Sequence, residues 1–299
     1  MTRRGRRLAL ALVGCVGVAG LAASWRVGGD LVRPLQRAVD MPSELGAAAV
    51  ALADSGGQPL AASFVDAGND SPGVVLLHGL GGTRADMAGR ATLLREAGFS
   101  TLLVDLPGHG ESPATNITLG WHESEAARAG LAWLRQARPG RRVGAIGTSL
   151  GGAAILLGPA PVPFDAVVIE AVYDTVDHAV FNRIHMRLGG VAHLLTPLLL
   201  LQIQPRLGIP RRNLRPEEAV RRLTAPILVV GGERDLHTTL ENTRALFAAA
   251  SEPKELWIVE GQEHVDFLQA QPIEYRRRVV GFLRRSLSSP ATPPPPRAR

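Results

Sequence analysis

A serine between two glycines, an aspartate and a histidine occur where their side chains could act together. Ser149 is the centre of Gly-Thr-Ser-Leu-Gly at residues 147–151, directly after an apolar run at residues 143–146. A serine hydroxyl is a weak nucleophile and needs a neighbouring base. Asp235 and His264 each follow a later apolar run, and an aspartate can hold an imidazole in the orientation and tautomer that a base requires. Together the three side chains predict nucleophilic attack on a carbonyl carbon.

The segment around Ser149 has the residues that a sharp strand-to-helix turn requires. Gly147 and Gly151 allow neighbouring backbone to approach closely, because a β-carbon at either position would clash. A helix that begins after Ser149 also favours negative charge at its N-terminus. The alternative is that Ser149 is only a small residue in a tight turn, and the chain order Ser, Asp, His argues against it.

A second glycine-rich segment, His-Gly-Leu-Gly-Gly at residues 78–82, follows the first buried apolar run. We expect Gly79 to be a loop glycine of the site. The backbone N–H of Leu80, together with that of Leu150 after the nucleophile, is expected to bind the oxyanion of a tetrahedral intermediate.

Several other carboxylates could take the place of Asp235 as the acid. Glu233 lies two residues earlier, and Glu170 and Asp174 follow the fourth apolar run. Asp235 could instead cap the helix that follows it, since aspartate is a favoured N-cap residue. We expect Asp235 to be the acid because it follows the fifth strand, at the same sheet edge as the histidine.

The histidines other than His264 are expected to have no catalytic role. His78 and His109 lie in glycine-rich loops and are expected to shape them by hydrogen bonding, and His237 to cap a helix or to face solvent. His264 as an ordinary surface histidine is the competing interpretation. No spacing such as His-x-x-x-His indicates a metal site, and the other histidines are scattered over helical segments: His122, His178, His185 and His193.

The surrounding pattern predicts the scaffold that would position these residues. Short apolar runs alternate with stretches of helical spacing, which predicts a parallel sheet that is buried on both faces. Ligands of such sheets bind at the carboxyl ends of the strands, where Ser149, Asp235 and His264 fall. The expected strands are 74–77, 101–104, 143–146, 166–169, 227–230 and 256–259, with a hairpin over 47–64 and helices at 84–97, 121–137, 239–250 and 266–287.

Residues 173–222 separate the fourth and fifth strands by far more than a normal connection. Leucine runs at 194–195 and 198–201 are followed there by Pro205, Pro210 and Pro216, and we expect a helical lid inserted over the active site. A larger amphipathic crossover packed on the sheet is the alternative. The leucines could line an acyl-chain groove or only pack the lid.

With these motifs the chain resembles the α/β-hydrolase superfamily, within the bacterial serine esterase, lipase and S33 aminopeptidase-like group. The resemblance rests on His-Gly at 78–79, Asp-Leu-Pro-Gly-His-Gly-Glu-Ser at 105–112, the Ser149 turn, Asp235 and His264. It implies an α/β-hydrolase fold, with a mostly parallel central sheet flanked by helices, and a Ser-His-Asp hydrolase without a metal or organic cofactor. Glu263 precedes His264 where such loops commonly carry glycine or another small residue.

The charge distribution argues against a nucleic-acid partner. The formal net charge is +6, but six of the positive charges are arginines of the two ends, and the body between residues 8 and 289 is formally neutral. Aromatic residues make up only 4% of the chain, which leaves little for base stacking. The one cysteine, Cys15, excludes an intrachain disulfide.

The N-terminus has the layout of a signal peptide or signal anchor. Residues 1–7 are strongly basic, and residues 8–24 are uncharged and mostly apolar. We expect residues 1–26 to anchor the protein at the outer face of a bacterial cytoplasmic membrane. Cleavage near residues 22–24, which gives a secreted or periplasmic protein, and a lipoprotein modified at Cys15 are the alternatives.

The expected organisation continues with a juxtamembrane stalk at 27–46, the hydrolase domain at 47–289 and a disordered proline-rich tail at 290–299. We expect a carboxylester hydrolase that acts on a small-molecule ester or lipid-like substrate through an acyl-enzyme. An aminopeptidase-like amide hydrolase, with Glu170 or Asp177 binding a free amine, and a non-catalytic binding protein on the same fold are the alternatives. The sequence predicts no oligomeric state.

Overall fold

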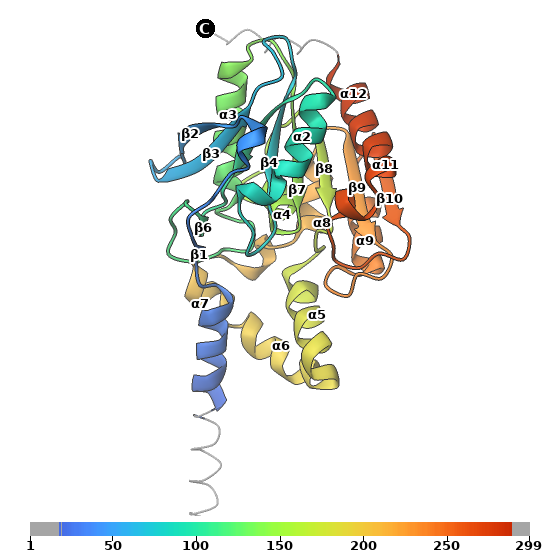
Figure 1. The fold of residues 1–299 in the computed structure, drawn as a ribbon. Helices are drawn as coiled ribbons and strands as arrows, with labels where there is room; N and C mark the ends of the chain where they lie inside the picture. The colour runs from blue at the N-terminus through green and yellow to red at the C-terminus, as the bar shows by residue number, and fades with distance from the viewer. Residues whose placement is uncertain (1–17, 19, 289–299) are drawn as a thin grey trace, which may run out of the picture.

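The computed structural model describes residues 18 and 20–288. Its centre is an eight-stranded sheet with the order β10-β9-β8-β7-β4-β5-β3-β2 (Figure 1). The strands are β2 (Ala48–Ala53), β3 (Pro59–Val65), β4 (Gly73–Leu77), β5 (Ser100–Val104), β7 (Val143–Thr148), β8 (Ala166–Glu170), β9 (Ile227–Gly232) and β10 (Lys254–Val259).

The strand directions follow the pattern of the sequence. Strands β4, β5, β7, β8, β9 and β10 pair in parallel. Strands β2 and β3 form an antiparallel hairpin, and β3 adds to β5 antiparallel. The hairpin turn is held by the Asp54 carboxylate, which accepts the N–H groups of Gly56 and Gln58. The expected α/β architecture with a mostly parallel sheet is therefore confirmed.

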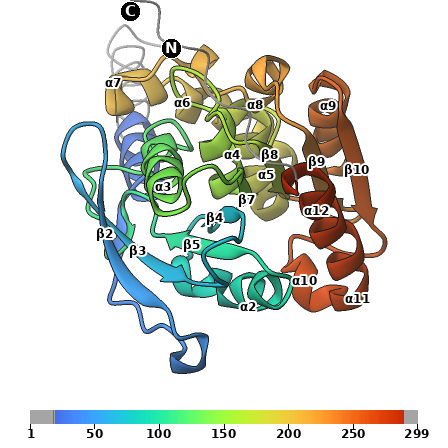
Figure 2. The same ribbon diagram turned by 90° about the horizontal axis from the view of Figure 1, so that it is seen from above.

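Helices cover both faces of the sheet, so the strands separate two buried clusters (Figure 2). Alternate strand residues point to opposite faces: Val75 and Leu77 belong to one cluster, and Val74 and Leu76 to the other. The first face is covered by α3 (Ser124–Ala137), α4 (Leu150–Leu156), α8 (Pro216–Ala219) and α9 (Leu240–Ala249). The second is covered by α2 (Ala88–Glu96), α10 (Phe267–Ala270), α11 (Pro272–Tyr275) and α12 (Gly281–Leu287).

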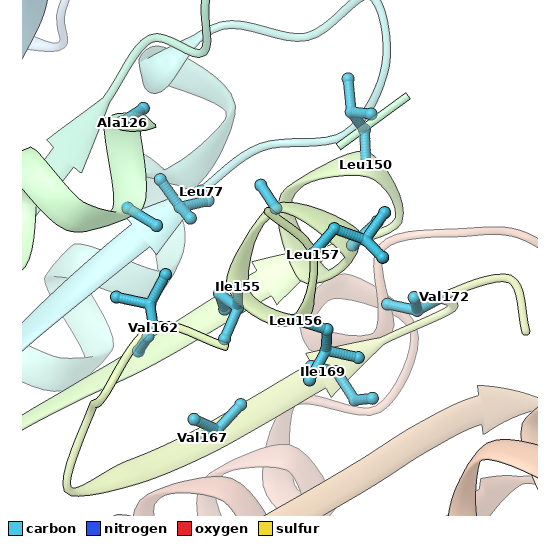
Figure 3. Packing of buried hydrophobic residues seen from close by; sticks show 14 of the residues in the cluster. Leu77, Ala126, Leu150, Ile155, Leu156, Leu157, Val162, Val167, Ile169 and Val172 are labelled. Atoms are coloured by element: carbon cyan, nitrogen blue, oxygen red, sulfur yellow. The ribbon is translucent and has the colours of Figure 1, made fainter. Parts of the chain in front are cut away.

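Helix α4 is the most enclosed of these helices, with all seven residues buried. Figure 3 shows Ile155 and Leu156 of α4 between strand and loop residues of the first cluster, among them Val162, Val167 and Ile169. Burial of one such side chain stabilises the fold by about 1.5–3 kcal/mol. This packing fixes the helix whose first residue follows Ser149.

The predicted helix over 266–287 is interrupted, and that part of the expectation is wrong. Gln271 takes a non-helical conformation before Pro272, which separates α10 from α11. Residues Arg276–Val280 then form a π-helical segment before α12. Proline lacks the N–H that would continue a helix, and its ring restricts the residue before it.

Residues 173–222 are helical throughout most of their length and are inserted between β8 and β9. They comprise α5 (Val176–Leu188), α6 (Ala192–Leu200), α7 (Ile203–Leu207), α8 and three short 3-10 segments, 189–191, 211–213 and 220–222. Figure 1 shows α5 and α6 projecting beyond the edge of the sheet, whereas α8 packs against α4 and α9. The segment is thus neither a simple crossover nor wholly packed on the sheet.

Residues 27–46, expected as a stalk, lie against the domain. The chain is helical through residues 20–31, and strand β1 (Leu35–Gln36) then pairs with β6 (His109–Gly110). Leu45 is buried in the second cluster. Backbone pairing of this kind leaves little signal in the sequence.

Most of the predicted anchor lies outside the described residues, as does the predicted tail at 290–299. Among the residues that the structure describes, no helix combines the length and the apolar character needed to cross a membrane.

Candidate active site

The predicted site residues meet at the carboxyl ends of the parallel strands. Ser149 directly follows β7, and His264 lies in the loop after β10. Both line one cavity of about 560 Å³, together with Gly79 and Leu80 from the loop after β4. Asp235, after β9, lies behind His264.

The backbone at Ser149 is a strained turn. Its φ and ψ angles are 49° and −109°, a conformation that L-residues rarely adopt. A β-carbon on Gly147 would lie 2.5 Å from the Gly151 carbonyl carbon, and one on Gly151 would lie 2.3 Å from the Leu77 carbonyl oxygen. Both glycines are therefore required by close backbone packing. A β-carbon on Gly79 would meet only ordinary contacts, the nearest at 3.6 Å.

Asp235 holds His264 by a hydrogen bond of 2.7 Å between Oδ2 and Nδ1. An ionised carboxylate only accepts hydrogen bonds, so Nδ1 carries the proton and Nε2 is left as the proton acceptor. Asp235 also accepts the hydroxyl and N–H of Thr238, at 2.7 and 2.9 Å. Burial alone would raise the pKa of Asp235, but the bonds from His264 and Thr238 outweigh it and hold that pKa below its ordinary value.

The other carboxylates considered from the sequence are occupied elsewhere. The buried Glu170 binds Arg90 at 2.6 Å and accepts the Tyr275 hydroxyl, and Asp174 binds His178 at 2.7 Å. Glu233 accepts the N–H of Gly261 at 2.8 Å. The N-cap of the helix after Asp235 is Thr239, so Asp235 is not that cap.

Leu80 and Leu150 carry the two backbone N–H groups that the sequence predicts for an oxyanion site. Leu150 is the first residue of α4, where N–H groups lack intrahelical partners. Neither N–H makes a hydrogen bond within the described part of the chain. Leu80, Ser149 and Leu150 line a common cavity, so both donors lie beside the serine without a protein acceptor.

His78 shapes the loop that carries Leu80. Its Nε2 accepts the N–H of Leu106 at 3.1 Å, so its Nδ1–H donates to the Gly79 carbonyl at 2.8 Å. Burial lowers the pKa of His78 to about 4, and the neighbouring His109 ring acts in the same direction. The centroids of the two rings are 5.2 Å apart. A neutral His78 with both ring nitrogens hydrogen-bonded fits the role predicted from the sequence, which is to shape this loop.

Residues 105–112, with the sequence Asp-Leu-Pro-Gly-His-Gly-Glu-Ser, support the loop that carries Leu80. The buried Asp105 carboxylate accepts the Arg84 N–H at 2.6 Å and pairs with the Arg84 guanidinium. It also accepts the Glu111 N–H at 3.0 Å. These bonds connect the segment to the residues that follow the Leu80 loop.

Four residues of the site were not predicted from the sequence: Thr238, His237, Arg90 and Arg183. His237 packs its ring on that of His264, with centroids 4.9 Å apart. Burial lowers the pKa of His237, and the positive charge of a protonated His264 lowers it further. Thr238 lies three residues from Asp235, which is a signal that could have been used, whereas the positions of Arg90 and Arg183 depend on long-range packing.

A second, apolar cavity of about 400 Å³ also opens at Ser149. Its walls come from α5, α6, α7 and residues 27–32. Gln202, next to α7, donates to Ser24 Oγ at 2.8 Å, and Arg206 of α7 donates to the Trp25 carbonyl oxygen at 2.5 Å. These bonds join the N-terminal helix to the insertion.

No group of three or more His, Cys, Asp or Glu side chains within residues 18 and 20–288 is arranged to hold a metal ion.

Comparison with known proteins gives one family match and several relatives. The sequence profile of the Alpha/beta hydrolase family matches residues 74–278. An uncharacterized protein of Mycobacterium tuberculosis is 30% identical over 204 residues, which cover 67% of this chain and 65% of that protein. An uncharacterized Bacillus subtilis protein is 22% identical over 220 residues, 72% of each chain. The match thus spans about two thirds of these relatives.

Solved structures show the same fold. A Pyrococcus furiosus esterase has a TM-score of 0.68 at 21% identity, with 85% of this chain and 99% of that chain covered. A Xanthomonas campestris protein, described as an a/b serine hydrolase without lid, has a TM-score of 0.56 at 20% identity, with coverage of 83% and 97%. At these identities the likeness establishes the fold alone.

Proposed function

The chain belongs to the alpha/beta hydrolase family, and from that premise we propose that it is a serine hydrolase of carboxylic esters. One observation carries the proposal: Ser149, on a strained turn, shares a cavity with His264, which is bonded to Asp235. No hydrogen bond joins Ser149 to His264 in the described part of the chain, and such bonds commonly tighten only when substrate binds.

In the proposed reaction, the Ser149 oxygen attacks the ester carbonyl while His264 Nε2 takes the hydroxyl proton. His264 then gives that proton to the departing alcohol, which leaves an acyl-enzyme. Water, deprotonated by the same imidazole, hydrolyses the acyl-enzyme and restores Ser149. Asp235 stabilises the imidazolium in both steps, and its low pKa keeps it charged.

The N–H groups of Leu80 and Leu150 would bind the oxyanion of each tetrahedral intermediate. One such donor typically contributes about 2.7–4 kcal/mol to stabilisation of the transition state. The bonds of His78 to Leu106 and Gly79 support this role, because they fix the loop before substrate arrives.

The apolar cavity beside Ser149 supports an ester with an apolar acyl chain. Its exposed lining is mostly carbon, and aliphatic side chains from α5, α6 and α7 face it. We propose that residues 173–222 act as a lid over this cavity. The aminopeptidase-like alternative has less support, because Glu170 is paired with Arg90 and Asp177 with Arg211, so neither is free to bind an amine.

We also propose that residues 1–26 hold the protein at the outer face of the bacterial cytoplasmic membrane. The basic and apolar character of that segment supports this location. So does a set of exposed apolar side chains on the N-terminal helix and the insertion: Val18, Leu21, Trp25, Val27, Leu31, Met186, Leu188, Val191, Leu194 and Leu201.

Membrane fractionation of the full chain tests the location. The protein is expected to stay in the membrane fraction after a carbonate wash, and a Cys15→Ser variant is expected to do the same. Release of that variant would indicate a lipoprotein, and recovery of the wild type in the soluble fraction would indicate cleavage of the signal.

The catalytic proposal is tested by turnover of short-chain p-nitrophenyl esters. Ser149→Ala is expected to lose activity by several orders of magnitude while keeping its thermal unfolding profile. Ser251→Ala, a matched change at an exposed serine, is expected to behave as wild type. Full activity of Ser149→Ala would refute the mechanism, and the absence of any hydrolysis by folded wild type would favour a non-catalytic binding protein.

A further inference from the structure

Arg183, in the middle of α5, lies at the junction of the two cavities. It lines both the cavity that contains His264 and the apolar cavity, and Leu80 and Ser149 are the other residues shared by the two. A cationic side chain thus borders both cavities together with Leu80 and Ser149.

The Arg183 guanidinium has no partner in the described part of the chain. Its half-buried side chain makes no hydrogen bond or ion pair there, although a guanidinium offers five N–H donors. The other arginine of the catalytic cavity, Arg90, is instead paired with Glu170 and Asp266. Tyr173 and Asp235 are the neighbours whose negative charge would favour the charged form of Arg183. The Tyr173 hydroxyl, however, donates to the Leu119 carbonyl, and the Asp235 oxygens are bonded to His264 and Thr238.

The electrostatic surroundings of Arg183 favour an anion from outside the protein. Arg187, one helical turn later, and Arg206 of α7 also line the apolar cavity, and no aspartate or glutamate does. Burial disfavours the charged form of Arg183, and the charge of Arg187 acts in the same direction. A bound phosphate or carboxylate would restore hydrogen bonds and compensate the charge.

We propose that Arg183 forms an anion subsite beside Ser149, and that the substrate is an ester with an apolar acyl chain and a phosphate or carboxylate on its alcohol part. The acyl chain occupies the apolar cavity, which leads away from Ser149 between α5, α6 and α7. The anionic group must then lie near the scissile bond, on the side of the leaving alcohol. This inference rests on the proposed esterase function and names its substrate class.

The first test compares two esters that differ in one charge: the octanoyl ester of 3-hydroxybenzoate and the octanoyl ester of methyl 3-hydroxybenzoate. A charge-assisted hydrogen bond is worth at least a tenfold change in affinity. Wild type is therefore expected to show a kcat/KM at least about tenfold higher for the anionic ester. Arg183→Gln should reduce this ratio to about one, and Arg183→Lys should retain part of it.

Arg212→Gln is the control, because Arg212 is an exposed arginine of the same insertion and lines neither cavity. It is expected to keep the wild-type ratio. A wild-type ratio of one or less, or an unchanged ratio in Arg183→Gln, would overturn the proposal.

A binding measurement separates this inference from the catalytic proposal. Titration calorimetry of octyl phosphate into the Ser149→Ala variant requires no turnover, and octanol serves as the neutral ligand. Octyl phosphate is expected to bind, with a Kd that rises at least about tenfold when Arg183→Gln is added. Equal Kd values with and without Arg183 would reject the subsite even if esters are hydrolysed, whereas an Arg183-dependent Kd without hydrolysis would reject only the esterase.

Discussion

Protonation of His78 is expected to destabilise the fold and the Leu80 loop below neutral pH. His78 is 1% exposed, and its Nε2 can accept the Leu106 N–H only while the ring is neutral. Its pKa is lowered from 6.5 in the unfolded chain to about 4 in the folded one. The folded protein therefore binds fewer protons, and the stability from a neutral His78 is present above pH 6.5 and lost as the pH falls toward 4.

The magnitude follows from the interval between the two pKa values. At about 1.4 kcal/mol per pH unit, the interval from 6.5 to about 4 corresponds to about 3 kcal/mol. This loss is a large part of the stability of an ordinary domain. It should be accompanied by a fall in esterase activity, because the loop that carries Leu80 loses a bond.

The assay is urea unfolding at a series of pH values between 7.5 and about 4, compared between wild type and His78→Gln. Glutamine can accept the Leu106 N–H without titrating, so this variant should be less stable at pH 7 but should lose about 3 kcal/mol less on acidification. His122→Gln, a change at an exposed histidine, should keep the wild-type slope. Equal pH slopes for wild type and His78→Gln would refute the assignment of a buried neutral imidazole.

Three further changes test the support of the site. Gly151→Ala should lower the free energy of unfolding by more than about 3 kcal/mol, since its β-carbon would meet backbone at 2.3 Å. In the control Gly190→Ala the new β-carbon has no atom within 4 Å, so the free energy of unfolding should change by less than about 1 kcal/mol. Equal effects of the two changes in urea titrations would contradict the close packing at Gly151. Thr238→Val should raise the pKa of Asp235 and lower kcat roughly fivefold at constant KM, and an unchanged kcat would exclude this positioning role. Arg90→Met leaves the buried Glu170 carboxylate without its cation and should lower the free energy of unfolding by about 3–5 kcal/mol. An unchanged midpoint of thermal unfolding would contradict this role of Arg90.

The sheet was predictable because its physical signal is local. Strands buried on both faces must be apolar at consecutive positions, so β4, β7 and β9 stand out in the sequence. The interruption of the last helix at Pro272 also had a local signal, which the helical spacing of the surrounding residues concealed. The packing of residues 27–46 had none, since the β1–β6 contact is backbone pairing between segments more than seventy residues apart.

The site was predictable to the extent that chain order and strand ends determine it. Ser149, Asp235 and His264 each follow a parallel strand, so they had to reach one edge of the sheet. Arg183 lies in the insertion, and its position depends on how α5 crosses that edge. Its lack of a partner depends on every neighbouring side chain, which no local pattern of residues encodes.

The most direct test of the central claim is covalent labelling by a fluorophosphonate probe, followed by peptide mapping. The proposed mechanism predicts a single adduct on Ser149, and labelling that is strongly reduced in His264→Ala, because the serine then lacks its base. An adduct on another residue, or equal labelling with and without His264, would contradict the account.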